Sequence, residues 1–258
     1  MPFGYGALIS DIRVSFGTGR HLDGLQKIYS VGSMMMAGFA GSVDVGFEMI
    51  EDLQRSFYLE QPADASVGKR AWYVEQACWR WHRRGRRIFA AAPVDLRRLG
   101  CELLLVGASP IPNAPFGGIS RCIQMSAPDF LPIRVRSSWA SIGTGALHET
   151  ARHYAENFFS VNAFSLLKGE VGNAGGAATT TAMFVAIGLG KAPMESVSPL
   201  LQVGQVSLAA HSIEGLRVGP PTEPNESRHT PVVRLARSRE ELYQMCDAIG
   251  ADAASGQA

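Results

Sequence analysis

The sequence lacks the features that would mark a disulfide framework or a metal site. Its cysteines are far apart and form no Cys-x-x-Cys pair: Cys78, Cys101, Cys122 and Cys246. That spacing indicates reduced, structural thiols. The histidines show no metal-ligand spacing either. We therefore expect no metal ion and no cofactor.

Long apolar runs and a charge imbalance are also missing. No run reaches the roughly 18 apolar residues that a membrane-spanning helix needs. The first residues do not combine a basic stretch with an apolar core, as a signal peptide does. The formal net charge of +1 offers no general attraction for nucleic acid or an anionic membrane. These absences predict a soluble, cytoplasmic protein without a nucleic-acid or membrane partner.

The sequence contains enough apolar residues to form a packed core. Hydrophobic residues make up 46% of the 258 residues and charged residues 18%, which is typical of a globular protein and not of a disordered one. We find no internal repeat and no linker, so we expect one domain over residues 1–258. The small, polar tail 251–258 is predicted to fray.

Apolar runs and helical periodicity predict strands, two helices, strands, two helices and again strands. This order indicates layers, with sheets inside and helices outside. The expected strands are Gly6–Asp11, Lys27–Tyr29, Met34–Phe39, Cys101–Ser109, Ile119–Ser126, Ser138–Ile142, Leu200–Ala210 and Pro231–Leu235. The expected helices are Ser42–Phe57, Lys69–Arg87, a long helix that starts at Gly143-Thr144-Gly145, Ala177–Leu189, and a capped helix from Ser238 to Ile249 that Gly250 ends.

Two stretches carry a family resemblance. The first contains Ala7-Leu8-Ile9-Ser10-Asp11, Leu25-Gln26-Lys27-Ile28-Tyr29 and Ala37-Gly38-Phe39-Ala40-Gly41, and the second is Ser141-Ile142-Gly143-Thr144-Gly145-Ala146. In order and spacing they resemble proteasome β-subunits, most closely the bacterial HslV-type peptidases. The resemblance covers about residues 6–57 and 138–157 and is only architectural elsewhere. It implies an α+β fold, the four-layer αββα sandwich of N-terminal-nucleophile (Ntn) hydrolases, with two antiparallel sheets flanked by helices.

The chemistry of that family explains why these residue types recur. An N-terminal threonine hydroxyl attacks a peptide carbonyl, and the amine of the same residue acts as the general base. A lysine beside it lowers the pKa of neighbouring groups, an acid orients the lysine, and a glycine N–H stabilises the oxyanion.

By the resemblance, Asp11 matches the acid and Lys27 the lysine, sixteen residues apart as in the family. Gly38 matches the oxyanion glycine, and Thr144 the serine that hydrogen-bonds the N-terminal amine. Glu195 and Ser198 have the spacing of a late auxiliary acid–serine pair, in which the family uses aspartate. We expect the side chains of Asp11 and Lys27 to converge on one point.

Each of these residues also has a plain structural explanation. Asp11 could cap a turn, Lys27 could be solvated, Gly38 could serve backbone geometry and Thr144 could cap a helix. The joint spacing of Asp11, Lys27 and the glycine string favours a proteasome-like site.

The nucleophile itself is missing from the chain as written. The first nine positions contain no Thr, Ser or Cys, and only ten residues precede Asp11, whereas the family places about sixteen there. Cleavage before Thr18 would remove Asp11 and the first strand. We expect a threonine-type endopeptidase only if the true start lies upstream of Met1.

The main hypothesis is a self-compartmentalising peptidase subunit that forms stacked homo-oligomeric rings and acts on peptides or unfolded proteins. In this family an ATPase unfoldase often feeds the chamber. One alternative is a non-catalytic structural ring subunit, and another is an Ntn amidohydrolase that acts on a small amide. The arginines of the second predicted helix form either a solvated face or a ring contact: Arg80, Arg83, Arg84, Arg86 and Arg87.

Overall fold

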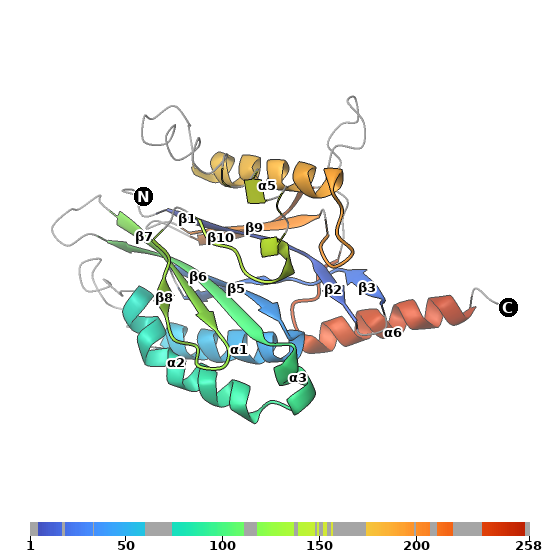
Figure 1. Cartoon of the computed structure of the whole chain (residues 1–258), viewed down its shortest axis with the longest axis horizontal. Coiled ribbons are helices and arrows are strands. Elements are labelled where there is room, and N and C mark those ends of the chain that lie inside the picture. The colour runs from blue at the N-terminus through green and yellow to red at the C-terminus, as the bar shows by residue number, and fades with distance from the viewer. Residues whose placement is uncertain are drawn as a thin grey trace.

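The computed structural model has a mixed α/β fold with more than one antiparallel sheet and, among the described residues, five α-helices (Figure 1). It describes residues 5–16, 19–32, 34–59, 74–110, 118–136, 139–147, 149, 152–153, 156, 174–198, 200–206, 211–218 and 234–255. No helix in these ranges combines the length and the hydropathy that a membrane span requires.

A three-stranded antiparallel sheet carries the first predicted strand at its edge. Its strands are, in spatial order, β1 (Gly6–Asp11), β9 (Leu201–Val206) and β10 (His211–Val218). The bounds of β1 agree with the prediction, and its last residue is paired with Leu201. Because β1 pairs only with β9 among the described strands, its other edge is open in this part of the chain.

The second sheet has five antiparallel strands in chain order: β4 (Ile28–Gly32), β5 (Met35–Gly41), β6 (Cys101–Pro110), β7 (Gly118–Ser126) and β8 (Ile133–Arg134). Four of them follow predicted strands closely, because continuous apolar runs are typical of strands buried on both faces. A short hairpin, β2 (Arg13–Ser15) and β3 (His21–Asp23), follows β1 and was not predicted.

Helices cover the outer face of each sheet (Figure 1). On the five-stranded sheet, α1 (Val43–Leu59) and α2 (Val74–Ala91) bury apolar side chains against β6, and α3 (Val94–Arg98) follows α2. On the three-stranded sheet, α5 (Ala174–Lys191) packs its alanines against β9. The predictions of α1 and α5 are confirmed to within a few residues. The helix predicted from Lys69 to Arg87 is confirmed from Val74 and continues to Ala91, whereas residues 69–73 lie outside the described residues. The short helix α3 was not predicted.

A third apolar cluster lies between the two sheets. Leu8 of β1 and Val206 of β9 join it from one sheet, and Ile28, Met36 and Leu104 join it from the other. The approach is close, because a Cβ atom added at Gly204 of β9 would lie 2.7 Å from Cγ2 of Ile28. The end of β1 therefore faces the five-stranded sheet.

The strand predicted at Ser138–Ile142 is wrong over residues 139–142, which belong to no strand; Ser138 lies outside the described residues. Ala140 and Ile142 pack against the cluster between the sheets, so the apolar pattern reflects burial and not pairing. Where a long helix was expected to start, Thr144–Leu147 forms the 3-10 helix η1. Farther along the expected helix, Glu149, Arg152, His153 and Glu156 are helical, and the rest of it lies outside the described residues.

The predictions near the C-terminus are corrected in length. β9 ends at Val206 instead of Ala210, and residues 207–210 lie outside the described residues. Arg234 and Leu235 belong to no strand; the next residue, Ala236, forms only an isolated bridge to Leu25, and residues 231–233 are not described. β10 was not predicted.

The last helix, α6 (Arg239–Ser255), begins at the predicted cap. The N–H of Glu241 donates to Oγ of Ser238 at 3.2 Å. The helix continues past Gly250, where we expected it to end, because alanine at 251, 253 and 254 has the highest helix propensity.

Candidate active site

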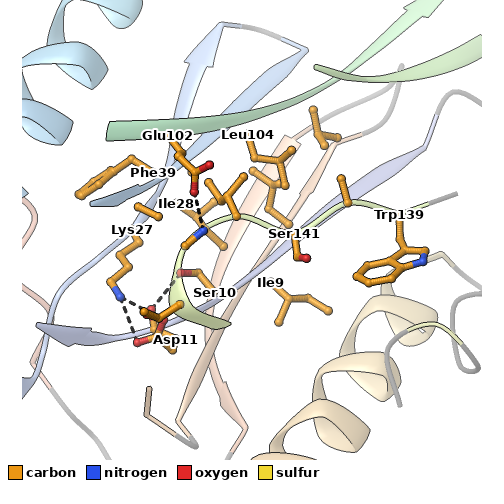
Figure 2. Close-up of a pocket in the computed structure, with 18 of the residues that line it drawn as sticks. Ile9, Ser10, Asp11, Lys27, Ile28, Phe39, Glu102, Leu104, Trp139 and Ser141 are labelled. Carbon is orange, nitrogen blue, oxygen red and sulfur yellow. Dashed lines mark hydrogen bonds and ion pairs between the residues drawn. The ribbon is translucent and has the colours of Figure 1, made fainter. Parts of the chain in front are cut away.

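The structure brings Asp11 and Lys27 together, as their spacing predicts. Nζ of Lys27 lies 3.0 Å from each carboxylate oxygen of Asp11 (Figure 2). The side chain of Asp11 is only 18% exposed and that of Lys27 only 15%. The N–H of Arg13 donates to Oδ1 of Asp11 at 2.8 Å, so the carboxylate is fixed from two sides. An ammonium group has three donors, and the hydrogen bonds to Asp11 leave one of them for a ligand.

A buried glutamine holds the backbone of the lysine in place. Oε1 of Gln202, on β9, accepts the N–H groups of Lys27 and Ile28 at 3.3 Å each. Gln202 is 1% exposed. Because β9 also pairs with β1, the strand that ends in Asp11, one element positions both members of the ion pair.

Gly38 and Thr144 line the same cleft as the ion pair. The cleft has a volume of about 1340 Å³. Gly38 lies in β5 between Ile28 and Leu104, and a Cβ atom added there would meet the carbonyl oxygen of Lys27 at 3.5 Å. Thr144 is exposed and opens η1. The predicted roles of the Gly38 N–H in an oxyanion hole and of the Thr144 hydroxyl stay predictions.

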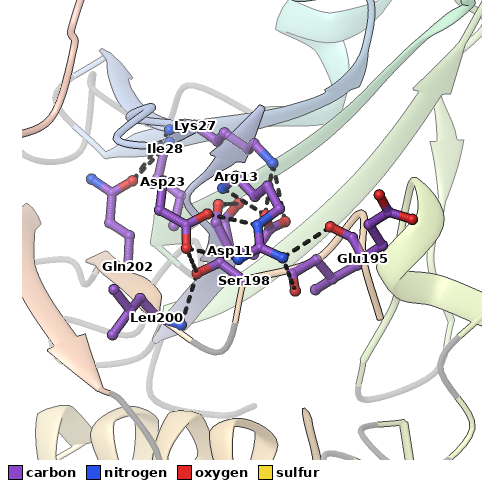
Figure 3. Close-up of polar contacts among 11 residues, drawn as sticks. Asp11, Arg13, Asp23, Lys27, Ile28, Glu195, Ser198, Leu200 and Gln202 are labelled. Atoms are coloured by element: carbon purple, nitrogen blue, oxygen red, sulfur yellow. Dashed lines mark hydrogen bonds and ion pairs between the residues drawn. The ribbon is translucent and has the colours of Figure 1, made fainter. Parts of the chain in front are cut away.

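The other two candidates, Glu195 and Ser198, do not line the cleft. The buried hydroxyl of Ser198 donates to Oδ2 of Asp23 at 2.9 Å and accepts the N–H of Leu200 at 3.1 Å (Figure 3). The side chain of Glu195 is exposed. The backbone carbonyl oxygen of Glu195 accepts a hydrogen bond from Nη1 of Arg13 at 2.9 Å. Neither side chain hydrogen-bonds Asp11 or Lys27 in the described part of the chain.

Arg13 and Asp23 form a second ion pair beside the first. Nε and Nη2 of Arg13 donate to the two carboxylate oxygens of Asp23 at 2.7 and 2.9 Å. The hydrogen bond to Asp23 raises the pKa of Arg13 above its usual value, although burial opposes this. Burial alone would raise the pKa of Asp23, but the hydrogen bonds from Arg13 and Ser198 lower it below its usual value.

A third carboxylate, Glu102 at the start of β6, also lines the cleft. Its Oε2 accepts the N–H of Gly143 at 2.7 Å. Gly143 has φ +69°, and a Cβ atom there would lie 2.6 Å from Cβ of Ala40 in β5. Only glycine tolerates this position, because both its backbone angle and its close approach exclude a side chain. Glu102 thus holds the turn before Thr144 against the end of β5.

The thiols that line the cleft are poor nucleophile candidates. Burial raises the pKa of Cys101 to about 12, with a further contribution from the charge of Glu102, and burial raises the pKa of Cys122 to about 12. A thiol with such a pKa is protonated at neutral pH, whereas the thiolate is the nucleophile. In the residues that the structure describes, no group of three His, Cys, Asp or Glu side chains is arranged to hold a metal ion.

Sequence reasoning missed Arg13, Asp23, Glu102 and Gln202. A signal existed for the first two, because the stretch Phe16-Gly17-Thr18-Gly19 contains two glycines, as turns often do. Arg13 and Asp23 are each five residues from Thr18, so a hairpin centred there places the opposite charges across from each other. Glu102 and Gln202 gave no such signal, because their partners are 41 and 174–175 residues away in the chain.

Comparison of the sequence with protein-family models and with curated proteins found no match.

Proposed function

We propose that this chain is the subunit of a proteasome-like peptidase of the N-terminal-nucleophile type. The observation that carries the proposal is the ion pair of Asp11 and Lys27 at the cleft end of β1, on the open edge of its sheet. In this reading, Lys27 lowers the pKa of an N-terminal hydroxyl or amine, and Asp11 holds Lys27 in place. The N–H of Gly38 stabilises the oxyanion.

The open edge of β1 supplies the place for the nucleophile. A strand that preceded β1 and paired with this edge in antiparallel fashion would begin beside Asp11. β1 has six residues and spans about 20 Å, so a partner strand of similar length would bring its first residue to the ion pair. The printed sequence has no Thr, Ser or Cys ahead of β1. We therefore propose that, if the chain is active, its nucleophile lies upstream of Met1.

The packing of the elements supports the finer fold assignment. Helices cover the outer faces of both sheets, and an apolar cluster joins their inner faces. We infer from this the four-layer αββα sandwich of the Ntn-hydrolase fold. The fold alone does not give the function, since one fold serves many activities.

The proposal extends to partners and location. Substrates would be peptides or unfolded proteins, and the subunits would assemble into stacked homo-oligomeric rings in the cytoplasm, with or without an ATPase unfoldase. Arg83, Arg86 and Arg87 are exposed on α2 and would pair with acidic groups of a neighbouring subunit. The second candidate is a non-catalytic ring subunit of the same kind of assembly.

The test uses protein expressed from its own gene with the natural upstream sequence. Its mature N-terminus is determined by mass spectrometry, its size by light scattering, and its activity with fluorogenic peptides. We expect a mature chain that begins with Thr, Ser or Cys, a ring-sized assembly and peptide hydrolysis that requires that first residue.

The alternatives give different results. A ring-sized assembly without hydrolysis would support the non-catalytic subunit. A monomer or dimer that hydrolyses a small amide would support the amidohydrolase. A mature chain that begins at Met1 or Pro2 would contradict the proposed location of the nucleophile.

A further inference from the structure

Glu102 carries a charge that the proposed reaction does not use. Its side chain lies on the same face of β6 as Leu104 and Val106, which belong to the cluster between the sheets. Oε2 of Glu102, which is labelled in Figure 2, accepts the N–H of Gly143, and Oε1 has no hydrogen-bond partner among the described residues. No described cation forms an ion pair with Glu102.

The position of this carboxylate is close to the proposed oxyanion site. Gly38 is paired with Leu104, and Glu102 is two residues before Leu104, so Gly38 and Glu102 are diagonal neighbours in the sheet. Such neighbours are about 7–8 Å apart. The residue directly opposite Glu102 is Ala40, on which the turn at Gly143 packs, and Glu102 still lines the cleft. If one group of a ligand is bound at Gly38, a neighbouring group of the same ligand would reach Glu102.

The cationic groups of the cleft do not cancel this charge. Lys27 is paired with Asp11 and Arg13 with Asp23. By strand register, the Cα atoms of Arg134 and Arg121 lie about 14 Å and about 17 Å from that of Glu102. Neither guanidinium forms an ion pair with Glu102 in the part of the chain that the structure describes. Arg136 and Arg152 are exposed, so their charges are screened by solvent.

We propose that Glu102 makes this end of the cleft a binding site for a cationic group, with the lysine or arginine side chain of a peptide as its ligand. One carboxylate oxygen holds the turn before Thr144, and the other accepts a charge-assisted hydrogen bond from the ligand. If this site sets a cleavage preference, that role rests on the proposed peptidase function. The binding itself requires no catalysis.

The experiment measures binding of three fluorescent hexapeptides to the full chain by anisotropy. The peptides differ at one position, which carries arginine, its neutral analogue citrulline, or glutamate. We expect the arginine peptide to bind about tenfold more tightly than the citrulline peptide, which corresponds to about 1.4 kcal/mol. The glutamate peptide should bind most weakly. The difference between arginine and citrulline should shrink in high salt.

A matched pair of variants isolates the charge. Glu102→Gln keeps an acceptor for the N–H of Gly143 and removes the charge, so it should bind the arginine and citrulline peptides equally. Glu51→Gln removes one charge from an exposed position of α1 and should keep the tenfold difference. Thermal melting of both variants checks that they are folded.

The results distinguish a failure of the binding site at Glu102 from a failure of the proposed peptidase function. Failure of the wild-type chain to prefer the arginine peptide, or to bind it at all, overturns the inference without any variant. An unchanged preference in folded Glu102→Gln does the same. An arginine preference without hydrolysis would leave the inference standing and count against the peptidase, and hydrolysis without the preference would do the reverse.

Discussion

Two ion pairs lie side by side at the end of β1, and they differ in what surrounds them (Figure 3). Both are largely buried, and Arg13 connects them, because its backbone N–H donates to Asp11 and its guanidinium to Asp23. In the pair of Asp11 and Lys27, the ammonium donates only to the carboxylate among the residues that the structure describes, and it faces the cleft. In the pair of Arg13 and Asp23, Nε, Nη1 and Nη2 of the arginine all donate to protein acceptors.

The difference indicates a catalytic role for the pair of Asp11 and Lys27 and a structural role for the pair of Arg13 and Asp23. Arg13 binds the carbonyl oxygens of Glu195 and Val197, and Asp23 accepts the hydroxyl of Ser198, so this pair ties the β2–β3 hairpin to the turn that follows α5. Lys27 keeps one donor for a ligand. We infer that removal of the Arg13–Asp23 pair lowers stability, whereas removal of the Lys27 charge lowers activity.

The largest expected effect is on activity. In active protein expressed with its upstream sequence, Lys27→Met should lower kcat/KM at least about 100-fold, because the positive charge that lowers the pKa of the nucleophile is lost. The free energy of unfolding should change less than in the Asp23 variant below. Peptide hydrolysis and urea unfolding of the same preparation measure both quantities. Activity within about threefold of wild type would contradict the role of Lys27.

Asp23→Ala should have the largest effect on stability. It leaves the guanidinium of Arg13 without its carboxylate and the hydroxyl of Ser198 without an acceptor. We expect a loss of about 2–3 kcal/mol in the free energy of unfolding, somewhat below the value for a fully buried pair. Urea unfolding measures it. A loss below about 1 kcal/mol would show that the pair does not hold the hairpin.

Ser198→Ala should cost less. The variant loses a hydrogen bond to Asp23 and leaves the N–H of Leu200 without its acceptor, which should lower the free energy of unfolding by about 1–2 kcal/mol. In a double-mutant cycle with Asp23→Ala the losses should not add, because the two residues share one hydrogen bond. Additive losses would contradict the shared network.

The lowered pKa of Asp23 predicts an acid-dependent contribution to stability. A carboxyl group with a lowered pKa stabilises the folded state fully above its usual pKa of 3.8, and the contribution is lost as the pH falls through the lowered pKa. The free energy of unfolding of Asp23→Asn should therefore fall less steeply with acidification than that of wild type. Equal slopes in urea unfolding between pH 5 and pH 2.5 would count against this assignment.

The smallest effect is expected at an exposed arginine that serves as the control. Arg55 lies 4.0 Å from Asp52 and is 69% exposed. Arg55→Ala should change the free energy of unfolding by at most about 0.5 kcal/mol and leave activity unaltered. A larger change would mean that charge removal alone, and not the loss of a buried network, explains the other variants.

Local patterns were enough to predict most of the layers. The apolar run Gly6–Asp11 predicted β1, and helical spacing predicted α1 and α5 to within a few residues. The approach of Lys27 to Asp11 could be expected because the family spacing was present in the sequence. The assignments failed where apolar residues serve packing without pairing, as Ala140 and Ile142 do.

Contacts between distant segments were beyond sequence reasoning. Ser198 meets Asp23 across 175 residues, and Gln202 reaches the N–H of Lys27 across the same separation. These contacts depend on the register of β9 against β1 and on the bend after α5, which no local pattern encodes. The match of Glu195 and Ser198 to an auxiliary pair rested on spacing alone. In the structure the hydroxyl of Ser198 donates a hydrogen bond to Asp23.

The most direct test of the central claim is covalent labelling of the mature protein, expressed with its natural upstream sequence, by an inhibitor that reacts with N-terminal threonines. Intact mass and peptide mapping locate the adduct in wild type and in Lys27→Met. We expect one adduct in wild type, on the first residue of a strand that precedes β1, and its loss in the variant. No adduct in wild type, or equal labelling of the variant, would contradict it.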